Sequence, residues 1–90
     1  MNKSELIDAI AAKSNLTKSS AAKALEGFVE AVTESLKNGD QVTIVGFGTF
    51  TLRNREARTG RNPRTGETIN IPASKLPAFK PGKGLKDAVN

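Results

Sequence analysis

The chain has 90 residues, with 14 lysines and arginines against nine aspartates and glutamates, which gives a net charge of +5. It contains no cysteine and no histidine, and this excludes disulfides, zinc sites built from Cys or His, and mechanisms that need an imidazole base. The first residues do not lead into a signal-peptide core and no apolar run is long enough to span a membrane, so we expect a cytoplasmic protein. A core built from so few residues is marginal unless the chain associates with itself, and self-association is therefore expected.

The positive charge is concentrated in the second half of the chain. Residues 1–40 hold five lysines and six acidic residues, whereas residues 41–90 hold nine basic and three acidic residues. A one-sided excess of positive charge favours a polyanionic partner. Nucleic acid is the first expectation and an anionic membrane surface the second.

Two helices are predicted in the first 40 residues. Asn2 and Glu5 have the spacing of a capping box, and apolar residues recur at helical spacing over about residues 3–13. Thr17 is suited to cap a second, longer helix, which Gly39 ends. So short a link joins the two as a hairpin or a helix-turn-helix. The apolar face of the second helix includes Phe28, Val32 and Leu36.

The opposite face of the second helix argues against its insertion into a DNA groove. Glu26, Glu30 and Glu34 follow one another at i, i+4 spacing, and the phosphates that line a groove would repel them. A row of glutamates without apolar surroundings is usually a solvated face of a helix. We therefore interpret it neither as a metal site nor as an acid–base pair.

Beyond the second helix, the spacing of apolar residues changes from helical to alternating. Val42 and Ile44 fall on one face of a predicted strand. Gly46-Phe47-Gly48 is expected to reverse the chain into a second strand, in which Phe50 faces the core. The glycine pair does not match a nucleotide-binding fingerprint, because Thr51 stands where the third glycine should be and a strand follows.

Residues 58–66 form a turn-rich stretch with three arginines, two glycines and one proline. They include no aliphatic side chain beyond threonine methyls, so the segment has nothing to anchor it in an apolar core. Both flanks, residues 49–55 and 68–72, are extended runs. The simplest geometry is a projecting β-ribbon with residues 58–66 at its tip.

Arginine is used throughout this ribbon. From Arg53 to Arg64 there are five arginines and one acid, and residues 50–66 contain no lysine. Lysine would serve solubility equally well, so the choice of arginine favours a narrow, electronegative minor groove and forked contacts to phosphates. Arg53 and Arg55 share one face of the ribbon, and Arg58 falls on the other unless a bulge or twist brings it round.

Pro63 has two interpretations. The run Asn62-Pro63-Arg64-Thr65-Gly66 is ordinary turn chemistry, in which proline presets φ and glycine closes the reversal. A rigid apolar ring at the end of an arginine-rich finger is also suited to wedge between base steps, as minor-groove architectural proteins do. One residue can serve both purposes.

The chain returns to the body of the protein after the ribbon. Pro72, Pro77 and Pro81 suit edge positions of a sheet because they lack an amide proton. A last short helix is expected over about residues 83–89, where Gly84 costs about 0.5 to 1 kcal/mol relative to alanine. The basic surface continues here through Lys75, Lys80, Lys83 and Lys86.

Several segments together resemble a family signature. Gly46-Phe47-Gly48-Thr49-Phe50 is followed by Arg55-Glu56-Ala57-Arg58-Thr59-Gly60-Arg61-Asn62-Pro63 and by Thr65-Gly66. On these residues, and over essentially its whole length, the chain closely resembles the bacterial histone-like DNA-binding proteins of the HU and integration host factor family.

Together, the predicted elements and the resemblance imply an α+β fold: an N-terminal two-helix hairpin, a three-stranded antiparallel sheet with a long protruding β-ribbon arm, and a short C-terminal helix. The resemblance implies an intertwined dimer of one domain, residues 1–90. Residues 1–52 and 75–90 would form the dimer body and residues 53–74 the arm. The expected dimer core comprises Phe28, Val32, Leu36, Ile44, Phe47, Phe50 and Phe79.

The resemblance also implies that two arms curl round DNA and that Pro63 of each arm is wedged at a kink. Arg61 and Asn62 match tip residues in the groove. Positions that match backbone contacts are Arg53, Arg55, Arg58, Lys80 and Lys83, with Lys3 and Lys86 as candidates on the flank. The full set of expected DNA-binding residues is Lys3, Arg53, Arg55, Arg58, Arg61, Asn62, Pro63, Arg64, Lys75, Lys80, Lys83 and Lys86.

We therefore expect a non-enzymatic nucleoid protein without a cofactor or a membrane partner. It would bind double-stranded DNA with little sequence specificity, bend and compact it, and prefer bent, nicked or gapped duplexes. The second subunit is either identical or a paralogue. The alternatives are a site-specific bending factor of the integration host factor type, an RNA-binding protein and, least favoured, a nuclease that uses the glutamate row.

Overall fold

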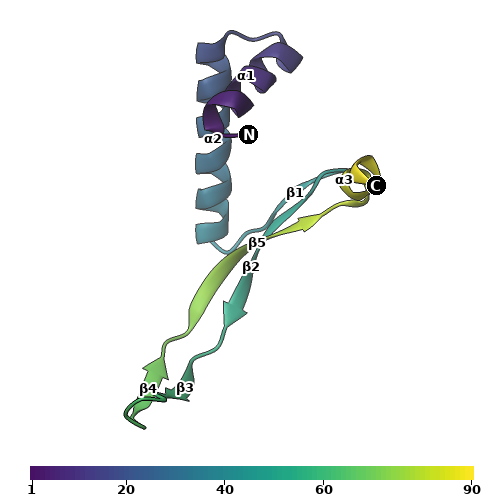
Figure 1. The fold of residues 1–90 in the computed structure, drawn as a ribbon. Helices are drawn as coiled ribbons and strands as arrows, with labels where there is room; N and C mark the ends of the chain where they lie inside the picture. Colours follow the sequence, from purple (N-terminus) through teal and green to yellow (C-terminus); the bar gives the residue numbers. More distant parts are fainter. The chain divides into compact units, whose positions relative to one another are not determined.

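The computed structural model describes all 90 residues and contains three helices and five strands in the order α1, α2, β1, β2, β3, β4, β5, α3 (Figure 1). The chain separates into two compact units, which we call unit 1, Met1–Ser35, and unit 2, Leu36–Asn90. None of the helices combines the length and the hydropathy that a membrane span requires.

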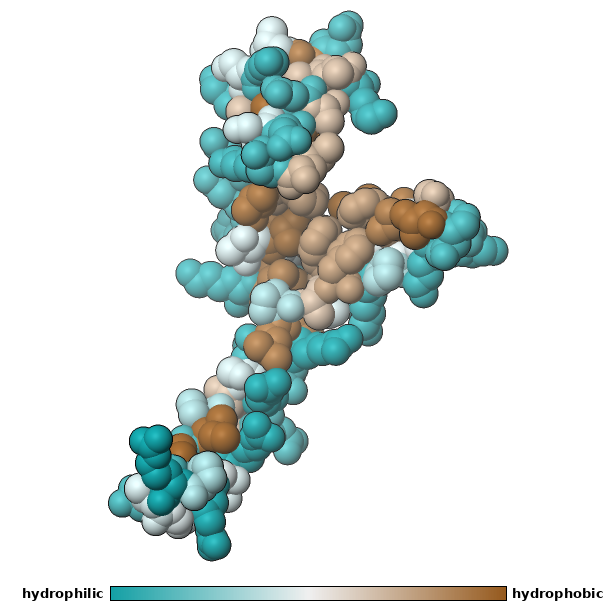
Figure 2. Space-filling model, viewed as in Figure 1, coloured by the Kyte–Doolittle hydropathy of each residue, from teal (hydrophilic) through white to brown (hydrophobic).

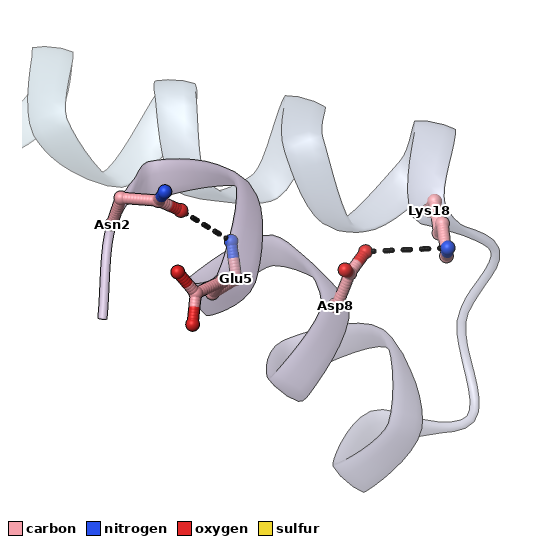
Figure 3. Close-up of polar contacts among 4 residues, drawn as sticks. All are labelled: Asn2, Glu5, Asp8 and Lys18. Atoms are coloured by element: carbon pink, nitrogen blue, oxygen red, sulfur yellow. Dashed lines mark hydrogen bonds and ion pairs between the residues drawn. The ribbon is translucent and has the colours of Figure 1, made fainter.

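Helix α1, Lys3–Ser14, begins where the sequence predicts because Asn2 caps it. The side-chain oxygen of Asn2 accepts a hydrogen bond from the backbone N–H of Glu5 at 2.9 Å (Figure 3). The helix ends at Asn15, whose φ of 57° is left-handed and directs the chain into the next helix. The predicted first helix and its cap are confirmed.

Helix α2 spans Lys18–Lys37 and begins at the predicted cap. The hydroxyl of Thr17 accepts a hydrogen bond from the backbone N–H of Ser20 at 3.1 Å. An ion pair joins the start of α2 to α1, with Lys18 Nζ 3.4 Å from Asp8 Oδ1 (Figure 3). Because both partners are more than half exposed, this ion pair contributes little to stability.

Unit 1 buries only small side chains. Ala11 of α1 and Ala21 of α2 are 8% and 0% exposed, and they are the only buried apolar residues of the chain. Larger apolar side chains of the same unit, Leu6, Phe28 and Val29, are 38%, 42% and 53% exposed. Unit 1 therefore has a very small buried core, and much of the apolar surface of α2 is uncovered in the single chain.

Unit 2 is built on an antiparallel sheet with the strand order β1-β2-β5. The strands are β1, Val42–Ile44, β2, Gly48–Arg55, and β5, Ser74–Pro81. The predicted reversal between β1 and β2 is confirmed: the N–H of Phe47 donates to the carbonyl of Ile44 at 3.0 Å, and Gly46 has a φ of 81° that favours glycine.

The sheet has one apolar and one polar face, because side chains alternate along a strand and cross-strand partners share a face. Phe50 lies opposite Phe79 with ring centroids 4.9 Å apart, and the Phe47 ring is 5.4 Å from that of Phe79. On the other face, Thr43 and Thr49 are paired and their hydroxyls are 3.3 Å apart. Figure 2 shows hydrophobic residues over the sheet, and mainly hydrophilic residues with a few hydrophobic ones over the outer part of the arm.

The arm continues from the sheet as a second, two-stranded ladder of β3, Arg58–Arg61, and β4, Thr68–Ile71 (Figure 1). Its register pairs Arg58 with Ile71 and Arg61 with Thr68. Neither ladder includes residues 56–57 or 72–73, so the ribbon is interrupted on both sides. The reversal occupies residues 62–67, because the strand pairing extends to Arg61. The sequence-based prediction had placed the whole of 58–66 at the tip.

Helix α3, Lys83–Val89, forms as predicted and approaches the turn between β1 and β2. A Cβ atom on Gly84 would lie only 2.5 Å from the carbonyl oxygen of Gly46. The absence of a side chain at Gly84 thus permits this close approach, which gives a packing reason for a residue that lowers helix propensity. Gly48 is similarly enclosed, because its Cβ would overlap the Phe79 ring.

Candidate nucleic-acid interface

Three of the predicted DNA-binding side chains share the polar face of the three-stranded sheet. Arg53 and Arg55 are two positions apart on β2, and Lys80 on β5 is opposite Thr49, so alternation places all three on one side. All three are exposed. Their neighbours on this face of β2 and β5 are Thr49, Thr51, Ser74, Leu76 and Ala78, none of which is acidic. We call this surface the basic face.

Threonines on the basic face were not singled out from the sequence. Thr43, Thr49 and Thr51 present hydroxyl groups beside the basic side chains. A hydroxyl is a short donor that can reach a phosphate oxygen, and such contacts position a protein on a duplex without reading its sequence. The alternation of Thr49, Thr51, Arg53 and Arg55 was the sequence signal that could have identified them.

Lys75 does not join the arginines of the basic face. It pairs with Asn54, one position out of phase with Arg53 and Arg55, and therefore belongs to the other side of the sheet. There it lines a small hollow together with Asp40 and Asn54. From the sequence we predicted that Lys75 and Lys80 belong to one continuous basic surface. The strand register instead places them on opposite faces of the sheet.

On the outer ladder of the arm, Arg58 and Arg61 lie at the two ends of β3 and on opposite faces, since they are three positions apart. The gap at residues 56–57 breaks the alternation between β2 and β3. Counting residues along one strand therefore does not tell whether Arg58 lies on the same face of the ribbon as Arg53 and Arg55.

The tip of the arm is closed by hydrogen bonds that centre on Asn62. Its backbone N–H donates to the carbonyl of Glu67 at 2.8 Å, and its own carbonyl accepts from the N–H of Gly66 at 2.7 Å. Its side-chain Oδ1 accepts from the N–H of Arg64 at 2.9 Å. Pro63 and Arg64 are exposed on this closed turn, as the sequence expected for the end of a projecting finger.

The remaining predicted contacts belong to helices and not to the strands of the sheet or the arm. Lys83 and Lys86 are exposed on α3. Lys3 belongs to unit 1, where its Nζ is 3.9 Å from Glu26 Oε1 and both side chains are more than half exposed. An ion pair at this distance and exposure is weak, so Lys3 remains available for an anionic partner.

The glutamate row of α2 is exposed on unit 1. Glu26, Glu30 and Glu34 do not gather with other ligand side chains, and no group of three or more acidic residues in the chain has the arrangement of a cation site. The dimer-core residues are divided between the units: Phe28 and Val32 lie on α2 in unit 1, whereas Leu36, Ile44, Phe47, Phe50 and Phe79 lie in unit 2.

The fold defines a small basic α+β protein with a protruding β-arm. It combines two N-terminal helices, a sheet with one basic face, and an arm that carries arginines and a proline at its end. The chain belongs to the family of bacterial DNA-binding proteins, whose family model matches residues 1–90.

The chain is similar to known DNA-binding proteins both in sequence and in fold. The chain is 61% identical over 90 residues to DNA-binding protein HU-beta of Pseudomonas aeruginosa, with 100% of both chains covered. It is 58% identical to DNA-binding protein HU 1 of Bacillus subtilis, covering 99% of this chain and 97% of that protein. The Anabaena HU–DNA cocrystal structure superposes with a TM-score of 0.88 at 48% identity, covering 99% and 97% of the two chains. HU from Thermotoga maritima gives a TM-score of 0.69 at 36% identity, with both chains fully covered.

Proposed function

We propose that this chain is a histone-like architectural protein that binds double-stranded DNA with little sequence specificity. The observation that carries the proposal is the combination of an acid-free basic face with an arm that ends in exposed Pro63 and Arg64. Its family membership and its similarity to a chain solved with DNA support the same function.

Most of the affinity would come from phosphates. Arg53, Arg55 and Lys80 are exposed on one face and have no acidic neighbour on β2 or β5 that would compete for them. Each phosphate that they neutralise releases counterions, so the binding constant should fall with salt at about −0.9 in log-log slope per contact. Contacts of this kind carry no sequence information, which explains the low specificity that we propose.

The arm would bend the duplex. Arginine is favoured in a narrow minor groove because of its negative potential, and an apolar wedge in that groove unstacks one base step and kinks the helix. Pro63 has the position for such a wedge, since it is exposed at the end of the ribbon. A sharp bend costs on the order of several kcal/mol, and nicked, gapped or pre-bent DNA already carries part of that cost.

We also propose that two chains form the binding unit. Ala11 and Ala21 are the only buried apolar residues, while Phe28, Phe47 and Phe79 are each about 40% exposed in the single chain. A chain of 90 residues without a large buried side chain lacks the hydrophobic contribution that a stable fold needs. A second subunit, identical or a paralogue, would cover these residues and supply a second arm.

A salt-titrated binding comparison of intact, nicked and pre-bent duplexes tests the proposal, together with mass measurement of the free protein. We expect a dimer, a steep salt dependence, tighter binding to the distorted duplexes, and similar affinities for unrelated sequences. A stable monomer, or a duplex whose path is unchanged on binding, would contradict it.

Pro63→Ala tests the wedge directly. We expect a smaller bend angle by fluorescence transfer and a reduced preference for nicked DNA, because the unstacking group is removed. The control is Arg61→Ala, which should weaken binding to every duplex by removing charge. Equal bend angles for the wild type and Pro63→Ala would remove the wedge role.

Other functions predict different results in these assays. A site-specific bending factor would bind one sequence far more tightly than random duplexes, and an RNA-binding protein would prefer RNA to DNA of the same form. A nuclease would cleave DNA when magnesium is added. For the architectural function that we propose, the protein acts where the chromosome lies, in the nucleoid.

A further inference from the structure

Asn62 differs from its neighbours at the end of the arm. It is half-buried, whereas every other residue from 61 to 70 is exposed. Its side chain and both of its backbone groups are engaged within the turn, with Arg64, Gly66 and Glu67 as partners at 2.7 to 2.9 Å. One asparagine therefore accounts for three of the hydrogen bonds that close residues 62–67.

The chemistry of the Arg64 contact fixes the orientation of the Asn62 carboxamide. A backbone N–H can only donate a hydrogen bond, so the side-chain atom that faces it at 2.9 Å is the oxygen and not the amino nitrogen. This is the asparagine turn that such a residue forms with the backbone two positions on. The Nδ2 amino group is left at the opposite end of the carboxamide.

Pro63 depends on this closure because it has no hydrogen bond of its own to define its place. Proline has no backbone N–H, and its side chain at the tip is exposed rather than packed. Its ring fixes its own φ, but the direction of the ring relative to the ribbon is set by the residues on either side. Those residues, Asn62 and Arg64, are the two that the asparagine turn connects.

We propose that Asn62 is a positioning residue, which closes the tip before DNA binds and thereby fixes Pro63 at the apex of the arm. The inference rests on the proposed wedge and adds the residue that holds it. A preformed tip binds with a smaller loss of conformational freedom than a mobile one, so the closed turn favours insertion of the wedge.

The same orientation limits what Asn62 contributes to base recognition. Both A·T and G·C pairs present acceptors in the minor groove, whereas only G·C adds a donor. An amino group at the free end of the carboxamide can donate to either pair and does not discriminate between them. The turn thus supports a tip that bends DNA without selecting its sequence.

Three substitutions separate positioning from a direct contact. Asn62→Ala removes both ends of the carboxamide, whereas Asn62→Asp and Asn62→Ser keep an oxygen that can accept from the Arg64 N–H but remove the amino donor. Asn70→Ala is the matched control, since Asn70 is an exposed asparagine on β4 of the same arm and lies outside the turn.

The first measurement is amide hydrogen exchange at Arg64 and Gly66 in the free dimer. We expect exchange to accelerate about five- to tenfold in Asn62→Ala, as for the loss of one hydrogen bond, and to return toward the wild-type rate in the Asp and Ser variants. The second measurement has two parts, the ratio of the affinities for nicked and intact duplexes and the bend angle of the bound duplex. A ratio is used because the carboxylate of Asn62→Asp would weaken binding to both duplexes by repelling phosphates.

The proposal requires both readouts to change together. In Asn62→Ala, protection from exchange, the bend angle and the preference for nicked DNA should all decrease, and in Asn62→Asp and Asn62→Ser all three should return toward wild type. Asn70→Ala should change none of them. Unchanged exchange in Asn62→Ala would overturn it, and so would restored exchange without restored bending, which would make the amino group a direct DNA contact. Should Pro63→Ala leave bending unchanged while the Asn62 variants alter exchange, the wedge itself fails and the positioning role fails with it.

Discussion

The two units of the chain differ in charge but share an uncovered apolar surface. Unit 1 has four lysines and five acidic residues, whereas unit 2 has ten basic and four acidic residues. Each unit leaves large apolar side chains exposed, such as Val29 at 53% in unit 1 and Phe47 at 42% in unit 2. Charge distinguishes the two units, since the excess of positive charge that we propose for DNA binding lies in unit 2. Apolar exposure does not distinguish them, which is why we propose that a further subunit covers residues of both units.

The largest expected effect comes from the apolar face of the sheet. Phe79 and Leu76 are 37% and 40% exposed in the single chain but lie on opposite faces of β5. If a second subunit covers only the apolar face, Phe79→Ala should destabilise the dimer by about 3 kcal/mol or more, as for a buried aromatic residue. Leu76→Ala, on the basic face, should cost less than about 1 kcal/mol. Thermal unfolding at fixed protein concentration measures both, and equal losses would refute the division of the faces.

Two glycines, one in each unit, should respond to alanine in opposite directions. A Cβ on Gly48 would overlap the Phe79 ring and lie 2.6 Å from the Lys80 carbonyl oxygen, so Gly48→Ala should cost about 1 to 3 kcal/mol. Gly27 has open space around its Cβ position in the middle of α2, so Gly27→Ala should stabilise by about 0.5 to 1 kcal/mol. Chemical denaturation measures both. A stabilised Gly48→Ala protein would show that the sheet is less tightly packed than the structure indicates.

A smaller effect distinguishes the charges of the two units. Arg55→Ala should lower the magnitude of the log-log salt slope of DNA binding by about 0.9, because one phosphate contact is lost. Its stability should change by no more than about 0.5 kcal/mol, since the side chain is exposed. Glu30→Gln on α2 is the control and should leave the slope unchanged. A slope that responds to Glu30 and not to Arg55 would place the DNA on unit 1.

The smallest effect is expected from the ion pair between α1 and α2. Asp8→Asn removes the partner of Lys18, but the two side chains are 55% and 78% exposed, and such pairs contribute about 0 to 1 kcal/mol. The melting temperature should therefore move by only a few degrees at low salt and hardly at all at high salt. A large loss of stability in Asp8→Asn would mean that unit 1 depends on charge more than on the burial of its apolar side chains.

The sequence by itself determined the features that depend on residues close together in the chain. Asn2 and Thr17 cap their helices and Gly46 reverses the chain between β1 and β2, since each of these needs only local geometry. The positions of Arg53, Arg55, Pro63 and Arg64 on an exposed ribbon also followed from local composition and alternation.

The tertiary structure alone decided which residues face the same way and how closely the segments approach. Lys75 and Lys80 belong to different faces because of the register between β2 and β5, which no count along one strand reveals. Residues 56–57 belong to no strand, so the alternation of side chains between the two faces does not continue from Arg53 to Arg58, as the sequence had suggested. Asn62 was expected to contact DNA, and only the folded turn shows that its oxygen is engaged by Arg64. Gly84 is explained by the carbonyl of Gly46, 38 residues earlier, because contact between distant segments exists only once the chain has folded.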